Sequence, residues 1–305
     1  MTTGNLYLIS AATGQTGAHA VRILRQDGLR VRALVHSLDA RAEALADLGA
    51  EVVVGDLLDF ASVSSAMAGV TAAYFCYPIR PGLLDATANF AQAAAEAGVR
   101  AVVNMSQISA RREAKSHAAQ NHWLSERLLD RSAFFTTHLR PTFFAEWLVW
   151  QWSRDDRGGV FRLPFADGRH APIAAVDQAR VIAAILRNPA PHDRQVYPLY
   201  GPLELDNDGI AAKVAAALEI PVRYEPVGIA SFAEVLRAQG FDEYFVQHIS
   251  SVAQDYRDGI FAGTNNLVDA ITGTPALTVE EFTTTNSHAF AGTGQASAWE
   301  VPRAS

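Results

Sequence analysis

The first half of the chain alternates short apolar runs with segments in which apolar residues recur every three or four positions. The short runs predict buried strands, and the three-to-four spacing predicts amphipathic helices. The strands are expected at residues 6–9, 31–35, 52–54, 72–77, 102–105 and 134–139. The helices between them are expected at residues 17–26, 40–48, 61–67, 83–97 and 118–129.

Strands that are apolar throughout belong in a parallel sheet with both faces covered by helices. Right-handed crossovers then produce a doubly wound parallel α/β fold of the Rossmann type. The pattern changes after Pro141, where the aromatic run FFAEWLVWQWS is followed by a loop, a short strand and a helix. Helices then dominate and are expected at residues 209–218, 231–239, 241–259 and 279–290.

These changes divide the chain into two expected domains and a tail. The Rossmann domain is expected to comprise residues 1–153 and 172–200. A smaller, mainly helical domain on the substrate side is expected to comprise residues 154–171 and 201–290. Residues 291–305, AGTGQASAWEVPRAS, should form a loosely held tail.

Composition and charge narrow the classes of protein. The 305 residues can bury a sizeable core, and 49% hydrophobic with 19% charged residues is ordinary for a globular protein. A net charge of −7 disfavours a general nucleic-acid surface. The one cysteine, Cys76, excludes an intramolecular disulfide, and no apolar stretch approaches the ~20 residues of a membrane span. The protein is therefore expected to be cytoplasmic, with neither nucleic acid nor membrane as a direct partner.

The segment AATGQTG lies between the first expected strand and the first expected helix. Gly14 and Gly17 supply the last two positions of a G-x-x-G-x-x-G spacing, while Ala11 takes the first and suits the tight turn if its φ is negative. Backbone amides at a helix start bind a pyrophosphate when no Cβ stands in the way. This loop is therefore predicted to bind a dinucleotide, unless it is a vestige in a fold that no longer does so. The predicted contacts are Ala11, Thr13, Gly14, Gln15, Thr16 and Gly17.

The second and third strands bear on which dinucleotide is bound. An NAD-specific site places Asp or Glu at the tip of the second strand, where it binds the ribose hydroxyls. Here the tip carries His36 and Ser37, with Arg41 a turn later, and these side chains favour NADP(H) over NAD(H) unless His36 is merely a solvated loop residue. Asp56 and Leu57, after the third strand, are predicted to bind and flank the adenine, unless Asp56 caps the next helix.

Taken in order, several segments resemble the NmrA-like branch of the atypical short-chain dehydrogenases: AATGQTG, VRALV, GDLLD, VVNMSQIS, LRPTFF and ITGTPALTVEEFTTTN. The resemblance runs from about Leu6 to Phe290 and implies a Rossmann domain, a small C-terminal domain and a cleft between them. Members include NAD(P)H-dependent quinone reductases, triphenylmethane dye reductases and isoflavone-reductase relatives. Others are regulators that bind the dinucleotide without turning it over. Two positions depart from the family: Ala11 replaces a glycine, and His36 replaces an arginine.

Ordinary short-chain dehydrogenases use Ser, Tyr and Lys, and their Tyr protonates the substrate oxygen. By resemblance Ser106 takes the serine position, His122 the lysine position and Ala118 the tyrosine position, so the usual proton donor is missing. His122 would hold the nicotinamide ribose or relay a proton, unless it is a helix-surface histidine. These two residues, Ser106 and His122, are the first catalytic candidates.

The fourth strand ends in the segment YFCYPI. Cys76, Tyr77 and Pro78 are predicted to wall the nicotinamide. Tyr77 is also a third catalytic candidate, as a proton donor. Cys76 is interpreted as a packed small residue rather than a nucleophile.

The segment RPTFF follows the sixth strand, and ligands bind at the carboxyl ends of parallel strands. The nicotinamide end would then be covered by Pro141, Thr142 and Phe143. An apolar pocket for a flat substrate would be lined by Phe144, Trp147 and Trp150. The alternative is that the spacing of three marks a buried helix face.

Together these residues favour an NAD(P)H-dependent oxidoreductase that passes hydride to a quinone-like or otherwise conjugated small molecule. Such acceptors take hydride readily and can draw their proton from solvent, so the missing Tyr matters less. A regulator that senses the dinucleotide and acts through a protein partner is the alternative, and a pathway enzyme for a specialised metabolite is a third reading. No metal-binding motif or G-x-S-x-G elbow is visible, and a homodimer stays open.

Overall fold

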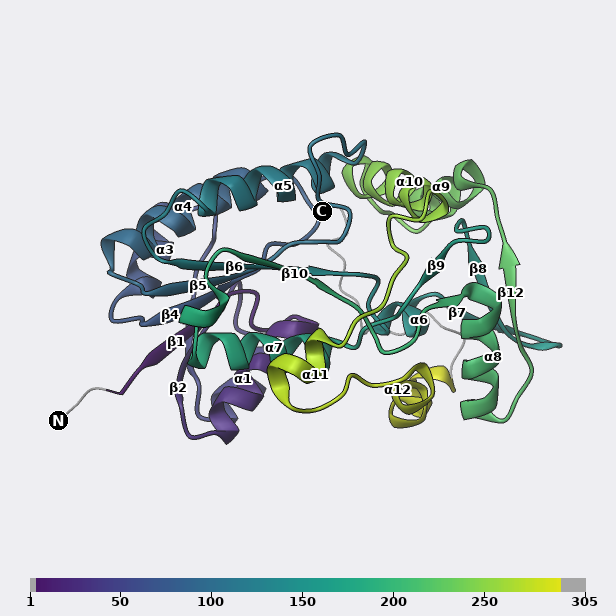
Figure 1. Ribbon diagram of the computed structural model, residues 1–305, viewed down its shortest axis with the longest axis horizontal. Helices are drawn as coiled ribbons and strands as arrows, with labels where there is room; N and C mark the ends of the chain where they lie inside the picture. Colours follow the sequence, from purple (N-terminus) through teal and green to yellow (C-terminus); the bar gives the residue numbers. More distant parts are fainter. Residues whose placement is uncertain (1–3, 292–305) are drawn as a thin grey trace. The chain divides into compact units, whose positions relative to one another are not determined.

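The computed structural model describes residues 4–291. Figure 1 shows the course of the chain, which forms two compact units. The first unit comprises Met1–Arg112, Gln120–Arg140 and Ala175–Pro198, and the second comprises Glu113–Ala119, Pro141–Ala174 and Leu199–Ser305. The predicted tail at residues 291–305 lies, apart from its first residue, outside the described residues.

A seven-stranded sheet in the order β10-β6-β5-β4-β1-β2-β3 forms the centre of the first unit. The strands β1 to β6 pair in parallel, and β1 lies between β2 and β4. Because strand order reverses between β1 and β4, their carboxyl ends form the switch point at which doubly wound folds bind ligands. The predicted Rossmann sheet is confirmed. Its strands are β1 (Leu6–Ile9), β2 (Arg30–Val35), β3 (Glu51–Val54), β4 (Ala72–Phe75), β5 (Ala101–Met105), β6 (Phe135–Pro141) and β10 (Gln195–Leu199).

Helices cover both faces of this sheet. Figure 1 shows α3, α4 and α5 on one face and α1 and α7 on the other. Helix α1 packs against α7 through a buried stripe that includes Ala20, Val21 and Leu24, and α3 packs against α4. The helices are α1 (Gln15–Gln26), α2 (Ala40–Asp47), α3 (Phe60–Met67), α4 (Leu83–Glu96), α5 (His117–Leu129) and α7 (Ala175–Arg187), with a short 3₁₀ turn at Ala190–His192.

The core of this unit lies between the sheet and the helices. Leu8 of β1, Phe75 of β4 and Phe90 of α4 are all completely buried, and the rings of Phe75 and Phe90 have centroids 4.7 Å apart. Each such side chain stabilises the fold by about 1.5–3 kcal/mol relative to its exposed state. The sheet is therefore a rigid support for the residues at its carboxyl edge.

The second unit combines helices with two small sheets. A three-stranded sheet has the order β12-β8-β7, and β9 pairs with β11. Its strands are β7 (Trp152–Asp155), β8 (Gly158–Leu163), β9 (Arg169–His170), β11 (Leu205–Asp206) and β12 (Val222–Pro226). Its helices are α6 (Glu146–Trp150), α8 (Asn207–Leu218), α9 (Ile229–Ala238), α10 (Glu243–Arg257), α11 (Leu267–Thr272) and α12 (Val279–Thr285), followed by a 3₁₀ turn at Ser287–Phe290.

Strands β7 and β12 were not expected from the pattern, and their stabilisation explains why. The Trp152 ring of β7 packs onto Gly159 of β8, where a Cβ would lie 1.9 Å from a ring carbon. On β8 and β12, Arg162 and Glu225 form an ion pair with a 2.7 Å separation, and Arg223 pairs with Asp155. These strands depend on cross-strand pairs rather than on apolar alternation.

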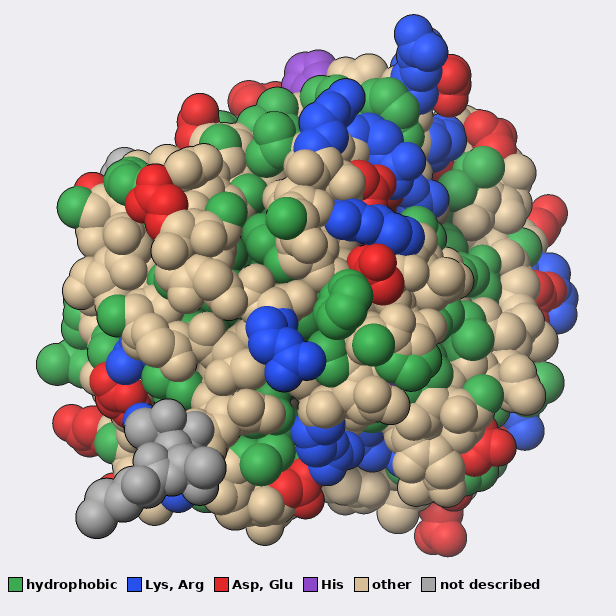
Figure 2. Space-filling model, turned by 60° about the vertical axis from the view of Figure 1, so that its left-hand side comes forward, with side chains coloured by type: hydrophobic (Ala, Val, Ile, Leu, Met, Phe, Trp, Pro, Cys, Tyr) green, Lys and Arg blue, Asp and Glu red, His purple; other side chains and the backbone are tan. Residues whose placement is uncertain are grey.

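On the face of the molecule shown in Figure 2, Lys and Arg side chains lie among Asp and Glu side chains. Ion pairs of this kind include Arg32–Glu51 and Arg127–Asp130, each with a 3.0 Å separation. Among the helices within residues 4–291, none has both the length and the apolar character needed to cross a membrane.

Candidate dinucleotide-binding and active site

The glycine loop joins β1 to α1 at the carboxyl end of the sheet. Gly14 precedes the helix in an extended conformation (φ −77°, ψ 169°), and no side chain caps the helix N-terminus. A Cβ on Gly17 would lie 2.3 Å from the Ala11 carbonyl oxygen, and one on Gly14 would lie 3.2 Å from it. The helix start therefore packs directly on the loop. An uncapped helix N-terminus beside a bare backbone fits a pyrophosphate.

The condition placed on Ala11 from the sequence is not met. Its φ is +47°, in the left-handed region where a Cβ crowds the following carbonyl. The turn imposes this value because the Ala11 carbonyl accepts a 2.9 Å hydrogen bond from the Gly14 amide and also faces Gly17. An alanine thus stands in a glycine conformation, at a cost of about 1–2 kcal/mol.

The tip of β2 places a basic residue next to an acidic one. His36 and Ser37 are exposed, whereas the Arg41 guanidinium is held by the Asp39 carboxylate at 2.5 Å. Asp39 also caps α2 by accepting from the amides of Arg41 and Ala42. The Arg41 hydrogen bond lowers the pKa of Asp39, so the carboxylate keeps its negative charge. The predicted phosphate-binding arginine thus carries an acidic neighbour.

Asp56 does not cap α3, contrary to the alternative considered from the sequence. The cap is Asp59, whose carboxylate accepts from the amides of Ala61 and Ser62. Asp56 instead accepts from the Leu58 amide within its own loop, at 2.9 Å. Its position at the carboxyl end of β3 agrees with the predicted adenine contact, which stays a prediction for both Asp56 and Leu57.

The loop after β4 is held to β1 by Ser10, whose hydroxyl accepts from the Cys76 amide at 2.9 Å. Burial raises the pKa of the Cys76 thiol to about 11, which opposes a nucleophilic role. The Tyr77 hydroxyl donates to the Pro81 carbonyl at 2.9 Å and accepts from Arg80 at 3.3 Å. These bonds fix Tyr77 within its own loop, beside the exposed Pro78.

Ser106 stands directly after β5 and takes part in a buried polar cluster. Its Oγ donates to Oε1 of Glu126 on α5 at 2.6 Å. Arg140 of β6 donates from Nε to Oε1 at 2.8 Å and from Nη2 to Oε2 at 2.5 Å, a bidentate pair. Glu126 is fully buried, and the Arg140 side chain is 23% exposed. Sequence analysis missed both residues.

His122 lies on α5 one turn before Glu126, and the ring is buried rather than on the helix surface. Its Nδ1 is buried and has no hydrogen-bond partner within residues 4–291. Burial lowers the pKa of His122 to about 4, and the nearby Glu126 carboxylate opposes that shift only in part. His122 is therefore neutral near pH 7. The alternative of a solvated surface histidine is wrong.

Ala118, which by resemblance is expected in the tyrosine position of ordinary short-chain dehydrogenases, has a buried side chain. The Ser106–Glu126–Arg140 cluster and His122 all belong to the first unit and include two of the predicted catalytic residues, Ser106 and His122. One signal in the sequence pointed to Glu126: it follows His122 by four residues, so both share a helix face. No such periodic relation links Arg140 to them.

In the second unit, Phe143 belongs to an aromatic cluster. Its ring stacks on Phe261 with centroids 4.8 Å apart and also contacts Phe165, His170 and Tyr256. The Tyr256 hydroxyl is hydrogen-bonded to His170 Nδ1, and burial lowers the pKa of His170 to about 3. This cluster was not predicted from the sequence. Phe143 is therefore a packing residue of this unit. Its predicted contact with the cofactor stays a prediction.

Other predicted residues of the second unit lie nearby in sequence. Pro141 and Thr142 are buried, and the Thr142 Oγ1 has no hydrogen-bond partner within the described residues. The rings of Trp147 and Trp150 on α6 meet edge to face with centroids 4.8 Å apart. The predicted substrate residues Phe144, Trp147 and Trp150 are all partly exposed, whereas the buried side chains of α6 are Leu148 and Val149. Their spacing of three does not mark the buried face of the helix.

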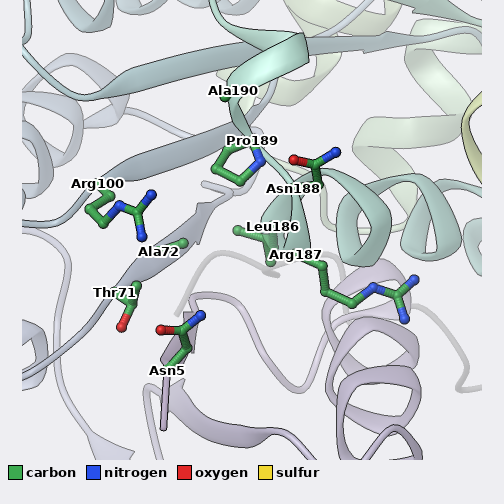
Figure 3. Close-up of a pocket in the computed structure, with 9 residues that line it drawn as sticks. All are labelled: Asn5, Thr71, Ala72, Arg100, Leu186, Arg187, Asn188, Pro189 and Ala190. Carbon is green, nitrogen blue, oxygen red and sulfur yellow. The ribbon is translucent and has the colours of Figure 1, made fainter. Parts of the chain in front are cut away.

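A small cavity of about 130 Å³ in the first unit lies away from these residues (Figure 3). It opens at the amino ends of the strands, where Asn5 precedes β1, Thr71 precedes β4 and Arg100 precedes β5. The C-terminal end of α7, including Arg187 and Asn188, forms its other side. Ligands of doubly wound folds bind at the opposite edge of the sheet. Within residues 4–291 no group of His, Cys, Asp and Glu side chains could hold a metal ion.

Comparison with known proteins places this geometry in a family. The profile described as NAD(P)H-binding matches residues 11–189, which include the glycine loop, Ser106, His122 and Glu126. The chain belongs to this NAD(P)H-binding family. The resemblance to NmrA-like reductases and regulators is confirmed, while the dinucleotide contacts at the helix start after Gly14 stay a prediction.

Relatives of the NAD(P)H-binding family cover nearly the whole chain. An NAD(P)H azoreductase of Xenophilus azovorans is 29% identical over 287 residues, 93% of this chain and 99% of that protein. The crystal structure of an NADPH-dependent quinone oxidoreductase of Escherichia coli complexed with NADPH is 25% identical, with a TM-score of 0.78. It covers 93% of this chain and 99% of its own. The negative transcriptional regulator NmrA in complex with NAD has the same fold (TM-score 0.78, 14% identity, 93% and 96% coverage).

Proposed function

We propose that this protein is an NAD(P)H-dependent reductase that passes hydride to an electron-poor, conjugated acceptor of the quinone type. The observation that carries the proposal is the polar equipment at the carboxyl edge of the sheet. Ser106 and a neutral, buried His122 stand there, while Ala118 leaves no acid in the tyrosine position. A quinone does not require that acid. The azoreductase and quinone oxidoreductase relatives support the same class of acceptor.

A bound NAD(P)H would supply a hydride, which carries two electrons and one proton, and NAD(P)⁺ would then be released. Hydride addition to a quinone leaves a hydroquinone anion, which is stable enough to take its proton from water. A simple ketone would leave an alkoxide, which needs a protein acid at pH 7. The chain's own residues orient the dinucleotide and exclude water. Gly14 and Gly17 receive the pyrophosphate, and Ser106 and His122 contact the nicotinamide end.

His122 suits this role because a neutral imidazole can accept and donate one hydrogen bond each. Its buried Nδ1 has no partner within the described residues, an unsatisfied state that costs about 1–3 kcal/mol. A ligand hydroxyl or amide would remove that penalty. We assign His122 to the nicotinamide ribose rather than to proton supply, since its lowered pKa disfavours the cationic form.

For the cofactor we propose that both dinucleotides bind and that NADP(H) is preferred only weakly. His36, Ser37 and Arg41 can meet a 2′-phosphate. Asp39 opposes them, because its carboxylate holds the Arg41 guanidinium at 2.5 Å and keeps its negative charge. The preference should therefore depend on this one acidic side chain.

On the substrate side we propose that Trp147 and Trp150 contact a flat apolar ring. Both are partly exposed and meet edge to face, which leaves aromatic surface for a ligand. Phe144 would extend this surface. Tyr77 is the weaker catalytic candidate, because its hydroxyl already donates to the Pro81 carbonyl.

The test is an assay of nicotinamide absorbance. The purified protein is mixed with NADPH or NADH and a panel of benzoquinones, naphthoquinones and azo dyes, with simple ketones as a matched control class. We expect oxidation with at least one conjugated acceptor and none with the ketones. Rapid ketone reduction would contradict the proposal, because it requires the acid that Ala118 cannot supply.

A second candidate function is a dinucleotide sensor without turnover. The buried Ala118 methyl in the tyrosine position is the observation that favours it. The two functions separate in the same assay: a sensor binds NAD(P)H with micromolar or tighter affinity yet oxidises it with no acceptor. Phe144, Trp147 and Trp150 would then have no catalytic effect when replaced by alanine.

A further inference from the structure

We propose that Glu126 and Arg140 are positioning residues that fix Ser106 as a hydrogen-bond acceptor toward the bound dinucleotide, so that Ser106 does not supply the reaction's proton. The inference rests on the proposed function in one respect: it takes the nicotinamide end of NAD(P)H to lie at Ser106. It concerns two residues to which neither the sequence analysis nor the proposed mechanism gave a role.

The first step is the charge state of the cluster. The Arg140 guanidinium donates two parallel hydrogen bonds to Glu126, one to each carboxylate oxygen, at 2.8 and 2.5 Å. Bidentate donation of this kind requires acceptors on both oxygens. Glu126 is fully buried, and the ion pair offsets the desolvation of its charge. Glu126 is therefore an acceptor-only carboxylate.

The second step concerns the Ser106 hydroxyl, which has one hydrogen to donate. Its Oγ lies 2.6 Å from Glu126 Oε1, a distance typical of a hydroxyl donating to a carboxylate. Because the carboxylate has no hydrogen, Ser106 must be the donor. The hydrogen is thus committed to Glu126, and only lone pairs of Oγ remain for a ligand.

The third step is the role that follows. The backbone also holds Ser106, since its amide donates to the Leu139 carbonyl at 2.8 Å. With backbone and side chain both fixed, Ser106 offers one preorganised acceptor to an N–H or O–H of the nicotinamide end. Ser106 therefore has no hydrogen to give to a substrate oxygen, and the quinone-type acceptor of the proposed function can take its proton from water.

The test is a double-mutant cycle on dinucleotide affinity, which does not require turnover. Ser106→Ala, Glu126→Gln and the double variant are titrated with NADPH by fluorescence in the full-length protein. We expect each single variant to weaken binding by about three- to tenfold, the effect of one hydrogen bond. The double variant should be no weaker than Ser106→Ala alone, because Glu126 acts only through Ser106.

Arg140→Gln covers the case in which Glu126→Gln does not fold, because the Arg140 side chain is 23% exposed and glutamine keeps an N–H donor for the Glu126 carboxylate. It should weaken NADPH binding in the wild-type background and have no effect in the Ser106→Ala background. The matched control is Arg237→Gln, which removes an exposed bidentate pair with Glu243 (2.6 and 3.0 Å) and should leave affinity unchanged.

Two results would overturn the inference. The first is that the losses from Ser106→Ala and Glu126→Gln multiply in the double variant, which would indicate independent roles. The second is that Arg140→Gln weakens binding equally in both backgrounds. The proposed reductase function can fail separately. If the cycle is non-additive but no acceptor oxidises NADPH, this inference stands and the reductase function is wrong.

Discussion

At the scale of single residues, the most informative position is Ala11. It holds the first place of the glycine spacing with φ at +47°, and its carbonyl faces both Gly14 and Gly17. Non-glycine residues in this region persist only where the surrounding structure imposes them. The strain lies in the glycine loop, the predicted dinucleotide site, where we infer that the turn geometry matters more than the stability of one residue.

Replacing Ala11 by glycine should therefore stabilise the protein. Relief of the left-handed strain exceeds the entropy that glycine adds to the unfolded chain, leaving a net gain of about 0.5–1 kcal/mol. Ala11→Val should be destabilising, because a β-branched side chain fits this conformation worse. Denaturant unfolding of both variants measures the effect. A less stable Ala11→Gly would show that the turn is not strained.

The two glycines of the loop should respond differently to substitution. A Cβ on Gly17 would lie 2.3 Å from a backbone oxygen, so Gly17→Ala should lose about 1–3 kcal/mol of stability together with dinucleotide binding. Gly14 has a negative φ and one contact at 3.2 Å, so Gly14→Ala should fold with little loss and bind NADPH more weakly. Thermal melts paired with NADPH titrations separate the two effects. Equal destabilisation by both variants would contradict the loop geometry.

Cofactor preference should depend on Asp39. Asp39→Asn keeps a good helix cap and removes the negative charge that holds Arg41. We expect the ratio of NADPH to NADH affinity to rise about two- to fivefold, a modest effect because the pair is exposed. Adding Arg41→Gln should cancel the gain. If the ratio does not move in low salt, these residues do not contact the 2′-phosphate.

At the scale of elements, the sequence predicted the first unit well because its strands are buried on both faces. Runs such as LYLI and AAYF are apolar throughout, and the helices between them have one buried stripe. Strands β7 and β12 escaped prediction because charged residues interrupt their apolar pattern and form ion pairs with other strands, Asp155 of β7 with Arg223 of β12, and Glu225 of β12 with Arg162 of β8. The Ser106–Glu126–Arg140 cluster could not be predicted from the sequence because its residues lie on β5, α5 and β6, which come together only when the chain folds.

Helix α5 shows how far the sequence could locate the site. The four-residue step from His122 to Glu126 is visible in the sequence and predicts a shared face. That this face is buried, that the His122 pKa falls to about 4 and that Glu126 bonds Ser106 depend on tertiary packing. The resemblance assigned Ala118 to the tyrosine position, and the consequence for proton supply stays a prediction.

At the scale of the whole molecule, each unit contains a buried histidine whose pKa is strongly lowered. Burial lowers the pKa of His122 in the first unit to about 4 and that of His170 in the second to about 3, from an ordinary value of 6.5. Below pH 6.5 the unfolded chain binds protons at these positions and the folded chain does not. The contribution of these two histidines to the free energy of unfolding is therefore fully present above pH 6.5 and is lost as the pH decreases.

We expect the free energy of unfolding to decrease by about 1.4 kcal/mol per pH unit for each of the two histidines between pH 6.5 and about 4. His170→Gln should reduce this slope, because glutamine can still accept from the Tyr256 hydroxyl and does not titrate. Urea unfolding at pH 7.5, 5.5 and 4.5 gives the slopes. The same slope in wild type and variant would show that His170 takes up its proton in the folded state.

The central claim is that hydride leaves the dinucleotide bound at the glycine loop. It is tested most directly with NADPH labelled with deuterium at C4 on one face or the other, turned over with a soluble quinone. We predict that the NADP⁺ formed retains the label from one labelled form and loses it from the other, because a fixed nicotinamide presents one face. The Gly14→Val variant should give no oxidation. Retention of mixed label, or no oxidation by the wild-type protein with any conjugated acceptor, would contradict the claim.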